Sequence, residues 1–124
     1  MPNLPNISDA EWEVMRVVWG RSPISANDVV ERVSRRKAWG PATIKTMLNR
    51  LVKKGALTFE QEGKRYLYRP KVSQDQCVRS ESRSFIQRVF NGAVAPMLNH
   101  FVQTQRLSKD EIAELRRILD RKEK

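Results

Sequence analysis

Trp39–Gly55, WGPATIKTMLNRLVKKG, is a helix-forming stretch with two chemically different sides. Pro41 can begin the helix because proline fits the first helical position, where its missing N–H is not needed. Gly55 stands where a left-handed C-cap is expected. We therefore predict a helix over residues 41–54. Its apolar side, facing a core, consists of Ile44, Met47, Leu48, Leu51 and Val52.

The other side of this helix carries hydroxyl, amide and cationic groups and no acid. A threonine methyl suits the thymine methyl, asparagine suits adenine and arginine suits guanine in the major groove of DNA. Because base contacts usually come from the N-terminal half of a recognition helix, we predict that Thr43, Thr46 and Asn49 read bases. Arg50 could read a base or hold a phosphate. Lys45, Lys53 and Lys54 are predicted phosphate contacts. The alternative is an ordinary solvated helix face.

The distribution of charge supports a polyanionic partner. The chain has 24 Lys and Arg against 14 Asp and Glu, a formal net charge of +10. Residues 34–54 contain seven basic and no acidic residues, whereas residues 1–33 contain three basic and five acidic residues. An acid-free basic block that coincides with a predicted helix is typical of a nucleic-acid interface. The alternative is a merely basic surface on a soluble protein.

The segments around this helix complete a known arrangement. Ser8 with Glu11 forms a capping box that begins a first helix, and Ser25 with Asp28 forms a weaker one that begins a second. After Gly55, residues 56–61 and 65–69 read as two strands joined by a turn. Three helices followed by a hairpin match a winged helix-turn-helix, which we assign to residues 1–72. Lys64 and Arg65, at the hairpin tip, are predicted to contact phosphates or the minor groove, unless they only form a hydrophilic turn.

Residues 73–124 are predicted to form three helices with too little core of their own. Ser73 and Ser108 begin two of them with box-like caps, and Pro96 fits the first turn of the middle one. Their apolar faces are most simply buried against a second copy of the chain. The fold class is thus mainly α with a small β-hairpin, a winged helix-turn-helix domain plus a C-terminal helical dimerisation region. The predicted dimerisation residues are Phe85, Val89, Met97, Leu98, Phe101, Leu115, Ile118 and Leu119.

Several functional classes lack support in the sequence. No run approaches the ~20 apolar residues of a membrane span, and the first residues lack a signal-peptide pattern. Cys77 is the only cysteine, and His100 has no Cys or acid at ligand spacing. The motifs of common hydrolases and nucleotide-binding enzymes do not occur. We expect a cytoplasmic protein without enzymatic activity, cofactor, metal site or membrane insertion, and we assign no role to Cys77.

Three segments together resemble the BlaI/MecI/CopY family of bacterial transcriptional repressors. They are ISDAEWEVMRVVW at residues 7–19, the stretch at residues 39–55 and LSKDEIAELRRIL at residues 107–119. The resemblance implies a homodimer in which each winged-helix domain occupies half of a dyad-symmetric, double-stranded DNA operator. It also implies half-sites similar to TACA and TGTA. In the BlaI and MecI branches, a membrane sensor metalloprotease responds to β-lactam and the repressor is cleaved in its dimerisation region.

The sequence departs from the family pattern at several positions. The C-terminus has no cysteines, so the copper sensing of the CopY branch is not supported. The cleaved bond of the β-lactam branches resembles Asn-Phe, but here His100 stands between Asn99 and Phe101. These three residues are the candidate cleavage region. Gly40 replaces a common Ser or Thr N-cap, and Ala42 occupies a backbone-contacting position where the family commonly has a basic residue.

Two other functional classes remain as alternatives to a sequence-specific repressor. A nonspecific architectural or RNA-binding protein would share the salt dependence but not the preference for one base sequence. A small enzyme or an interaction module on the same scaffold would need a pocket of converging polar groups. A repressor of this family with a different inducer is a further alternative.

Overall fold

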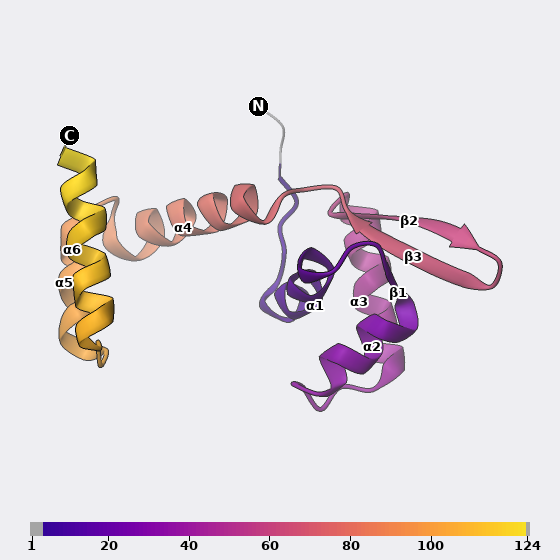
Figure 1. Cartoon of the computed structure of the whole chain (residues 1–124). Coiled ribbons are helices and arrows are strands. Elements are labelled where there is room, and N and C mark those ends of the chain that lie inside the picture. The colour runs from indigo at the N-terminus through magenta and orange to yellow at the C-terminus, as the bar shows by residue number, and fades with distance from the viewer. Residues whose placement is uncertain (1–3, 124) are drawn as a thin grey trace. The chain divides into compact units, whose positions relative to one another are not determined.

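The computed structural model describes residues 4–123 and divides the chain into two compact units. The first unit ends at Ser80 and the second begins at Glu81. The elements in chain order are α1 (Asp9–Gly20), β1 (Ile24–Ser25), α2 (Ala26–Ser34), α3 (Pro41–Lys54), β2 (Leu57–Glu62), β3 (Arg65–Pro70), α4 (Gln74–Phe90), α5 (Val94–Thr104) and α6 (Lys109–Glu123) (Figure 1). The predicted fold class, mainly helical with a winged helix-turn-helix, is confirmed.

The three helices α1, α2 and α3 pack against one another around the core of the first unit. From α3, the predicted residues Ile44, Met47, Leu48 and Leu51 are buried, and Val52 is partly buried. From α1, the core takes Val14, Met15 and Val18. Burial of apolar surface stabilises a fold by about 25 cal/mol per Å². The burial of these side chains is therefore the main contribution that holds α3 in place.

The sheet has three strands rather than the predicted two, in the order β1-β3-β2 with both pairs antiparallel. The short β1 pairs Ile24 with Tyr68 and Ser25 with Leu67. Two residues are too few to show the alternation that reveals a strand in a sequence, so β1 was not predicted. Its effect is to fix the middle of β3 beside the start of α2.

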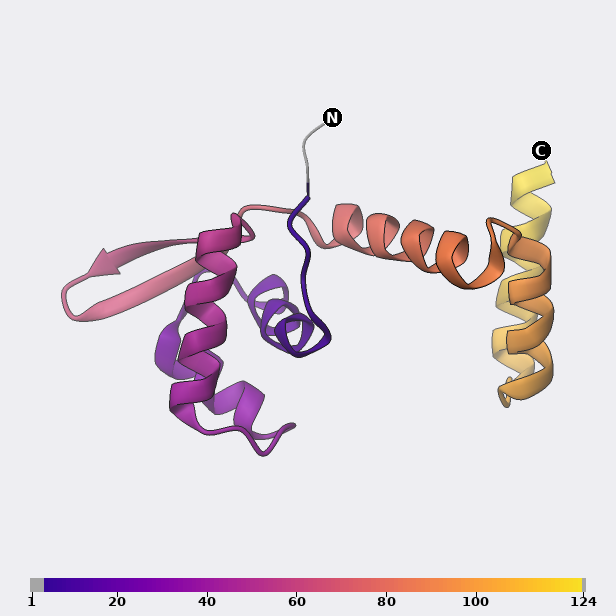
Figure 2. The same cartoon turned by 180° about the vertical axis from the view of Figure 1, so that it is seen from behind.

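Helix ends follow the local sequence as predicted. Ser8 and Glu11 form a complete capping box, and the Ser25 side chain accepts a hydrogen bond from the backbone N–H of Asp28. The C-cap of α3 is Gly55, with φ of 86° in the left-handed region. In α2 the regular helix ends at Ser34, with Arg35 as its C-cap. Figure 2 shows α3 at the front of the first unit, with the hairpin beginning beside its C-terminal end.

The second unit has no buried side chain among residues 81–123. Phe85 and Phe90 lie near Phe101, with ring centroids 6.4 Å apart in both pairs. These contacts join the end of α4 to α5 without enclosing a core. Large apolar side chains stay exposed along the unit, namely Val89, Val94, Leu98, Phe101, Val102, Ile112, Ile118 and Leu119. None of the helices within residues 4–123 combines the length and apolar character that spanning a bilayer requires.

Candidate nucleic-acid interface

One side of α3 is exposed and carries the side chains predicted to read DNA. Thr43, Thr46, Asn49 and Arg50 are exposed, as are the predicted backbone contacts Ala42, Lys45 and Lys53. Only the hydroxyl of Thr46 is turned to its own helix, where it donates to the carbonyl oxygen of Ala42. The Thr46 methyl group therefore remains the part available for an apolar contact with a base.

A hollow of about 330 Å³ lies between α3, the hairpin and the start of α2. Lys45 and Asn49 line it from α3, and Lys64 and Arg65 line it from the hairpin tip. The structure thus brings two of the predicted helix residues and both predicted hairpin residues to one place, whereas Thr43, Thr46, Arg50 and Lys53 lie outside the hollow. The remaining lining residues are Ser25, Ala26, Asn27, Tyr66 and Tyr68. No local sequence pattern marked Asn27 or Tyr66, because they join the hollow through tertiary packing.

The electrostatics of this hollow suit an anion. Lys45, Lys64 and Arg65 supply three cations, and none of them has an ion-pair partner within residues 4–123. Ala26 and Asn27 are the first residues of α2, whose N-terminus carries a partial positive charge. A phosphate fits this combination of cations and helix N-terminus.

The β2–β3 hairpin presents an aromatic face formed by Phe59, Tyr66 and Tyr68. Tyr68 is buried and belongs to the core of the first unit. Phe59 and Tyr66 are 44% and 41% exposed and meet edge to face with centroids 5.2 Å apart. Burial raises the pKa of Tyr68, and the neighbouring Tyr66 adds to the shift. The Tyr68 hydroxyl therefore stays protonated near neutral pH. Tyr66 lines the hollow, and a phenolic O–H can donate a hydrogen bond to an anion there.

Several basic side chains in residues 34–54 form ion pairs within the chain and are therefore less available to an anionic partner than the sequence suggests. Arg35 pairs with Glu31 and Arg36 pairs with Glu13, which lies on α1. Lys54, predicted as a phosphate contact, directs its ammonium toward Glu11 at 2.5 Å. Lys37, Lys45, Arg50 and Lys53 have no such acidic partner in the described part of the chain. The available charge therefore concentrates on α3 itself, with Lys37 preceding it.

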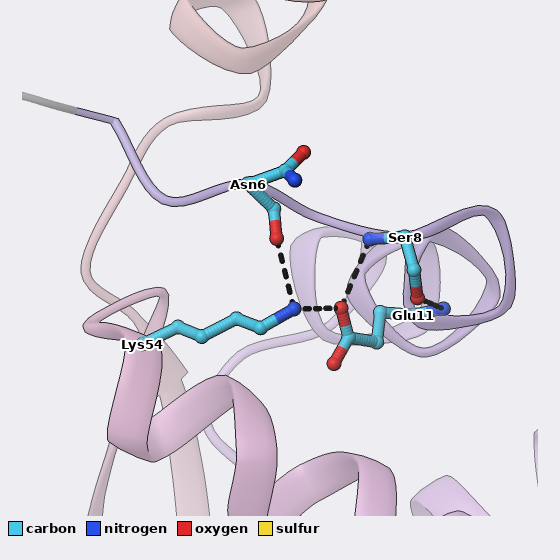
Figure 3. A network of polar contacts seen from close by, with 4 residues as sticks. All are labelled: Asn6, Ser8, Glu11 and Lys54. Carbon is cyan, nitrogen blue, oxygen red and sulfur yellow. Dashed lines mark hydrogen bonds and ion pairs between the residues drawn. The ribbon is translucent and has the colours of Figure 1, made fainter.

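Figure 3 shows how Lys54 is held. Its Nζ atom donates to Oε1 of Glu11 and, at 2.9 Å, to the carbonyl oxygen of Asn6. The same Oε1 atom of Glu11 accepts the backbone N–H of Ser8 at 2.9 Å. Burial alone would raise the pKa of Glu11, but the hydrogen bonds from Lys54 and Ser8 and the charge of Lys54 outweigh it. The pKa of Glu11 therefore lies below its ordinary value.

The remaining residues of interest lie in α4 and α5. The candidate cleavage region Asn99–Phe101 is in the middle of α5, and its side chains are exposed. Cys77 is buried in the core of the first unit, where burial raises the pKa of its thiol. A protonated, enclosed thiol is unreactive. The predicted dimerisation residues Phe85, Met97 and Leu115 are half-buried, and the other five are exposed.

The chain is similar to proteins of one regulatory family over nearly its whole length. The family model described as "Penicillinase repressor" matches residues 7–121. The Penicillinase repressor of Bacillus licheniformis is 42% identical over 120 residues, covering 97% of this chain and 94% of the relative. The methicillin resistance regulatory protein MecI of Staphylococcus aureus (strain N315) is 39% identical over 116 residues, covering 94% of each chain.

Two solved structures match more than half of the chain. The solution structure of the DNA-binding domain of the repressor BlaI has a TM-score of 0.55 and 47% identity. It covers 60% of this chain and 90% of the other. The monomeric form of Bacillus licheniformis BlaI in complex with the blaP half-operator has a TM-score of 0.54 and 47% identity, covering 60% and 92%.

Proposed function

Because the chain belongs to the penicillinase repressor family, whose members are DNA-binding transcriptional repressors, we propose that it represses transcription by binding a specific operator. The operator is a double-stranded, dyad-symmetric sequence with half-sites similar to TACA and TGTA. One winged-helix domain occupies each half-site. This assignment is supported by the likeness to the monomeric BlaI that was solved with a half-operator. A DNA partner implies a cytoplasmic protein.

The observation that carries this proposal is the joining of α3 and the hairpin tip around one cationic hollow. In it, Asn49 from the base-reading side of α3 lies with Lys64 and Arg65 from the hairpin tip. When α3 enters the major groove, Thr43, Thr46, Asn49 and Arg50 face base edges. Lys45, Lys64 and Arg65 then hold the sugar-phosphate backbone, with Lys53 further along the helix. Phosphate contacts of this kind set the register in which the base contacts form.

The repressor acts as a homodimer through the second unit. The second unit encloses no core, and its helices leave many apolar side chains exposed. Burial of these side chains against the same unit of a second chain would stabilise both copies. A dimer links two reading heads, so that once one half-site is bound the second is contacted at high effective concentration. Separation of the two copies would therefore lower operator occupancy steeply.

Release from DNA by proteolysis is the finer part of the proposal. A sensor metalloprotease that responds to β-lactam would cut near Asn99–Phe101 and split the dimer. These residues are helical, and the side chain of Thr104 and that of Gln103 make hydrogen bonds back to this turn. A protease acts on extended backbone, so cutting here requires α5 to unwind locally. Loss of intact protein when the sensor and inducer are present would support this route, and persistence of intact protein would count against it.

Binding to DNA from the chain's own promoter tests the repressor function directly. A footprint on that promoter identifies the operator, and dissociation constants are then measured for the operator and for a scrambled duplex of equal composition. We expect wild-type protein to prefer the operator by at least ~10³-fold. Asn49→Ala should weaken operator binding by about tenfold or more and leave binding to the scrambled duplex nearly unchanged, because an amide-to-adenine contact carries ~1–3 kcal/mol of discrimination. Equal affinity of the wild type for both duplexes would instead indicate a nonspecific nucleic-acid-binding protein.

The dimer is tested separately with the full-length chain. Leu119 is 56% exposed on α6, and Leu119→Glu places a charge on the apolar surface while costing little in the isolated chain. We expect sedimentation velocity to show a monomer at concentrations where the wild type is dimeric, and operator affinity to fall with it. Lys109→Glu, an exposed charge reversal at the start of the same helix, is the matched control and should stay dimeric. A dimeric Leu119→Glu protein would remove this surface from the mechanism.

A further inference from the structure

We propose that Lys54 is a positioning residue for base reading, which sets the angle of α3 through Glu11 and does not contact DNA phosphate. This inference rests on the proposed function, because it concerns how the same helix reads its operator. The sequence alone instead predicted that Lys54 contacts a DNA phosphate. Its basis is the contact network that joins the end of α3 to α1 and to the segment before α1 (Figure 3).

The first argument is burial. The side chain of Glu11 is 3% exposed, and that of Lys54 is 36% exposed. A carboxylate buried to this degree needs a cation and hydrogen-bond donors, since an unpaired buried charge is strongly destabilising. Lys54 supplies the cation, and Ser8 supplies a backbone N–H. Moving the ammonium of Lys54 to a DNA phosphate would leave Glu11 enclosed without its counter-charge.

The second argument is the use of the ammonium's hydrogen bonds. An ammonium has three N–H donors, and Nζ of Lys54 directs two of them to Glu11 and to the carbonyl oxygen of Asn6. These acceptors belong to two segments, residues 4–8 and the first turn of α1, and they precede Lys54 in the chain by 48 and 43 residues. The contact therefore fixes one end of α3 to the rest of the unit.

The helix dipoles add to this arrangement. Glu11 lies in the first turn of α1, near the partial positive charge of that helix N-terminus. Lys54 is the last residue of α3, near the partial negative charge of that C-terminus. The ion pair thus lies between two helix ends whose dipoles favour it. Lys53, the neighbouring residue, is exposed and has no acidic partner within residues 4–123.

Because Lys54 is at the end of α3, a small change of the helix angle there displaces the base-reading residues at the other end. At ~1.5 Å of rise per residue, Thr43 is about 16 Å along the helix from Lys54, and a tilt of about 5° would move it by about 1.4 Å. Hydrogen bonds to base edges tolerate only a few tenths of an ångström. A small reorientation of α3 would therefore weaken sequence reading, while phosphate contacts from flexible lysine side chains would adapt.

The test compares Lys54→Met with the matched control Lys53→Met in the full-length protein. Dissociation constants are measured for the chain's own operator and for a scrambled duplex across a range of salt, at a temperature where circular dichroism shows both variants folded. For Lys54→Met we expect about tenfold weaker operator binding, less than about twofold change on the scrambled duplex, and an unchanged salt slope. For Lys53→Met we expect a similar loss on both duplexes and a salt slope reduced by about 0.9. Lys54→Arg, which can keep the ion pair, should restore operator preference.

Two results for Lys54→Met would overturn the inference. An equal loss on both duplexes with a reduced salt slope would make Lys54 a phosphate contact. Unchanged binding to both duplexes, with only a lower melting temperature, would limit Lys54 to a stabilising role.

Glu11→Gln provides a second variant, also useful if Lys54→Met does not fold. Glutamine can still serve in the capping box with Ser8, but it removes the counter-charge and leaves the ammonium of Lys54 free. The positioning role predicts the same loss of operator preference without a lower salt slope. A phosphate-contacting Lys54 predicts no loss, and that result would overturn the inference. A wild-type chain that does not distinguish the operator from the scrambled duplex would instead contradict the proposed function. Wild-type preference retained by both Lys54→Met and Glu11→Gln would contradict only the inference about Lys54.

Discussion

The indole N–H of Trp19, at the end of α1, donates to the carbonyl oxygen of Val72 at 3.0 Å, across 53 positions of the chain. Val72 packs partly buried against the core, and Cys77 in the first turn of α4 is buried in it. The chain leaving the hairpin therefore returns to α1 before α4 continues. The boundary predicted between residues 72 and 73 stays a prediction. Two truncated chains, ending at Val72 and at Ser80, would locate it, and we expect only the longer one to keep full stability.

Trp19→Phe should destabilise the first unit through the loss of this hydrogen bond. We expect a decrease of about 1 kcal/mol in the free energy of unfolding, beyond what the smaller ring costs, because the carbonyl of Val72 loses its donor. Urea unfolding measures the change. Trp12→Phe is the matched control, since Trp12 packs 5.3 Å from Trp19 and its indole makes no hydrogen bond to residues 4–123. Equal losses in the two variants would mean that only ring packing matters.

Lys64→Met should weaken DNA binding without changing sequence preference. Lys64 lines the cationic hollow at the hairpin tip, and a phosphate contact contributes affinity through counterion release. We expect a similar loss of affinity for operator and scrambled DNA and a decrease of about 0.9 in the slope of log K against log salt. Fluorescence anisotropy titrations at several salt concentrations measure both quantities. Lys109→Met, which removes the same charge from α6, should leave the slope unchanged. An unaltered slope for Lys64→Met would leave this residue as part of a hydrophilic turn.

Gly55→Ala should destabilise the junction between α3 and the hairpin. Gly55 has φ of 86°, and a side chain in this left-handed conformation costs roughly 1–2 kcal/mol. No heavy atom lies within 4 Å of an added Cβ, so the cost is conformational and not steric crowding with neighbours. Gly20→Ala is the matched control, because it is equally open and ends α1 without a positive φ. We expect urea unfolding to show a loss for Gly55→Ala and none for Gly20→Ala.

Local patterns predicted most of the fold. Proline at position 41, glycine at position 55 and the capping boxes act within a few residues, so the sequence contains what is needed to place the helix ends. The apolar spacing of α3 likewise identified its buried side. The strand β1 escaped prediction because two residues show no period, and its formation depends on pairing with the distant β3.

The candidate interface was predictable only in part. The acid-free side of α3 marked Lys45 and Asn49, but nothing near Asn27 or Tyr66 indicated that folding would bring them to the same hollow. The sequence also overstated the free charge, because Glu11, Glu13 and Glu31 pair with bases of the block. Such pairs join residues up to 43 positions apart. Counting charge along the chain does not reveal the pairs of Glu11 and Glu13, since tertiary packing brings these charges together.

The ion pair of Glu11 and Lys54 should make stability depend on acid pH. The pKa of Glu11 is lowered in the folded state, so the carboxylate stabilises the fold at pH above its unfolded-state pKa of about 4.3. This contribution is lost as pH falls through the lower folded-state pKa, where Glu11 becomes protonated. At neutral pH we expect Glu11→Gln to lower the free energy of unfolding by about 1–2 kcal/mol, a moderate value because Lys54 remains partly solvated.

Urea unfolding of the wild type and of Glu11→Gln between pH 2 and pH 7 measures this dependence. The difference between the two proteins should be largest at neutral pH and shrink toward zero in strong acid, because protonation of Glu11 then imitates the substitution. Glu31→Gln is the matched control, since Glu31 is an exposed partner of Arg35, the C-cap of α2, and such surface pairs contribute little. A difference between wild type and Glu11→Gln that is independent of pH would mean that the amide disturbs packing, and that the charge of Glu11 does not hold Lys54.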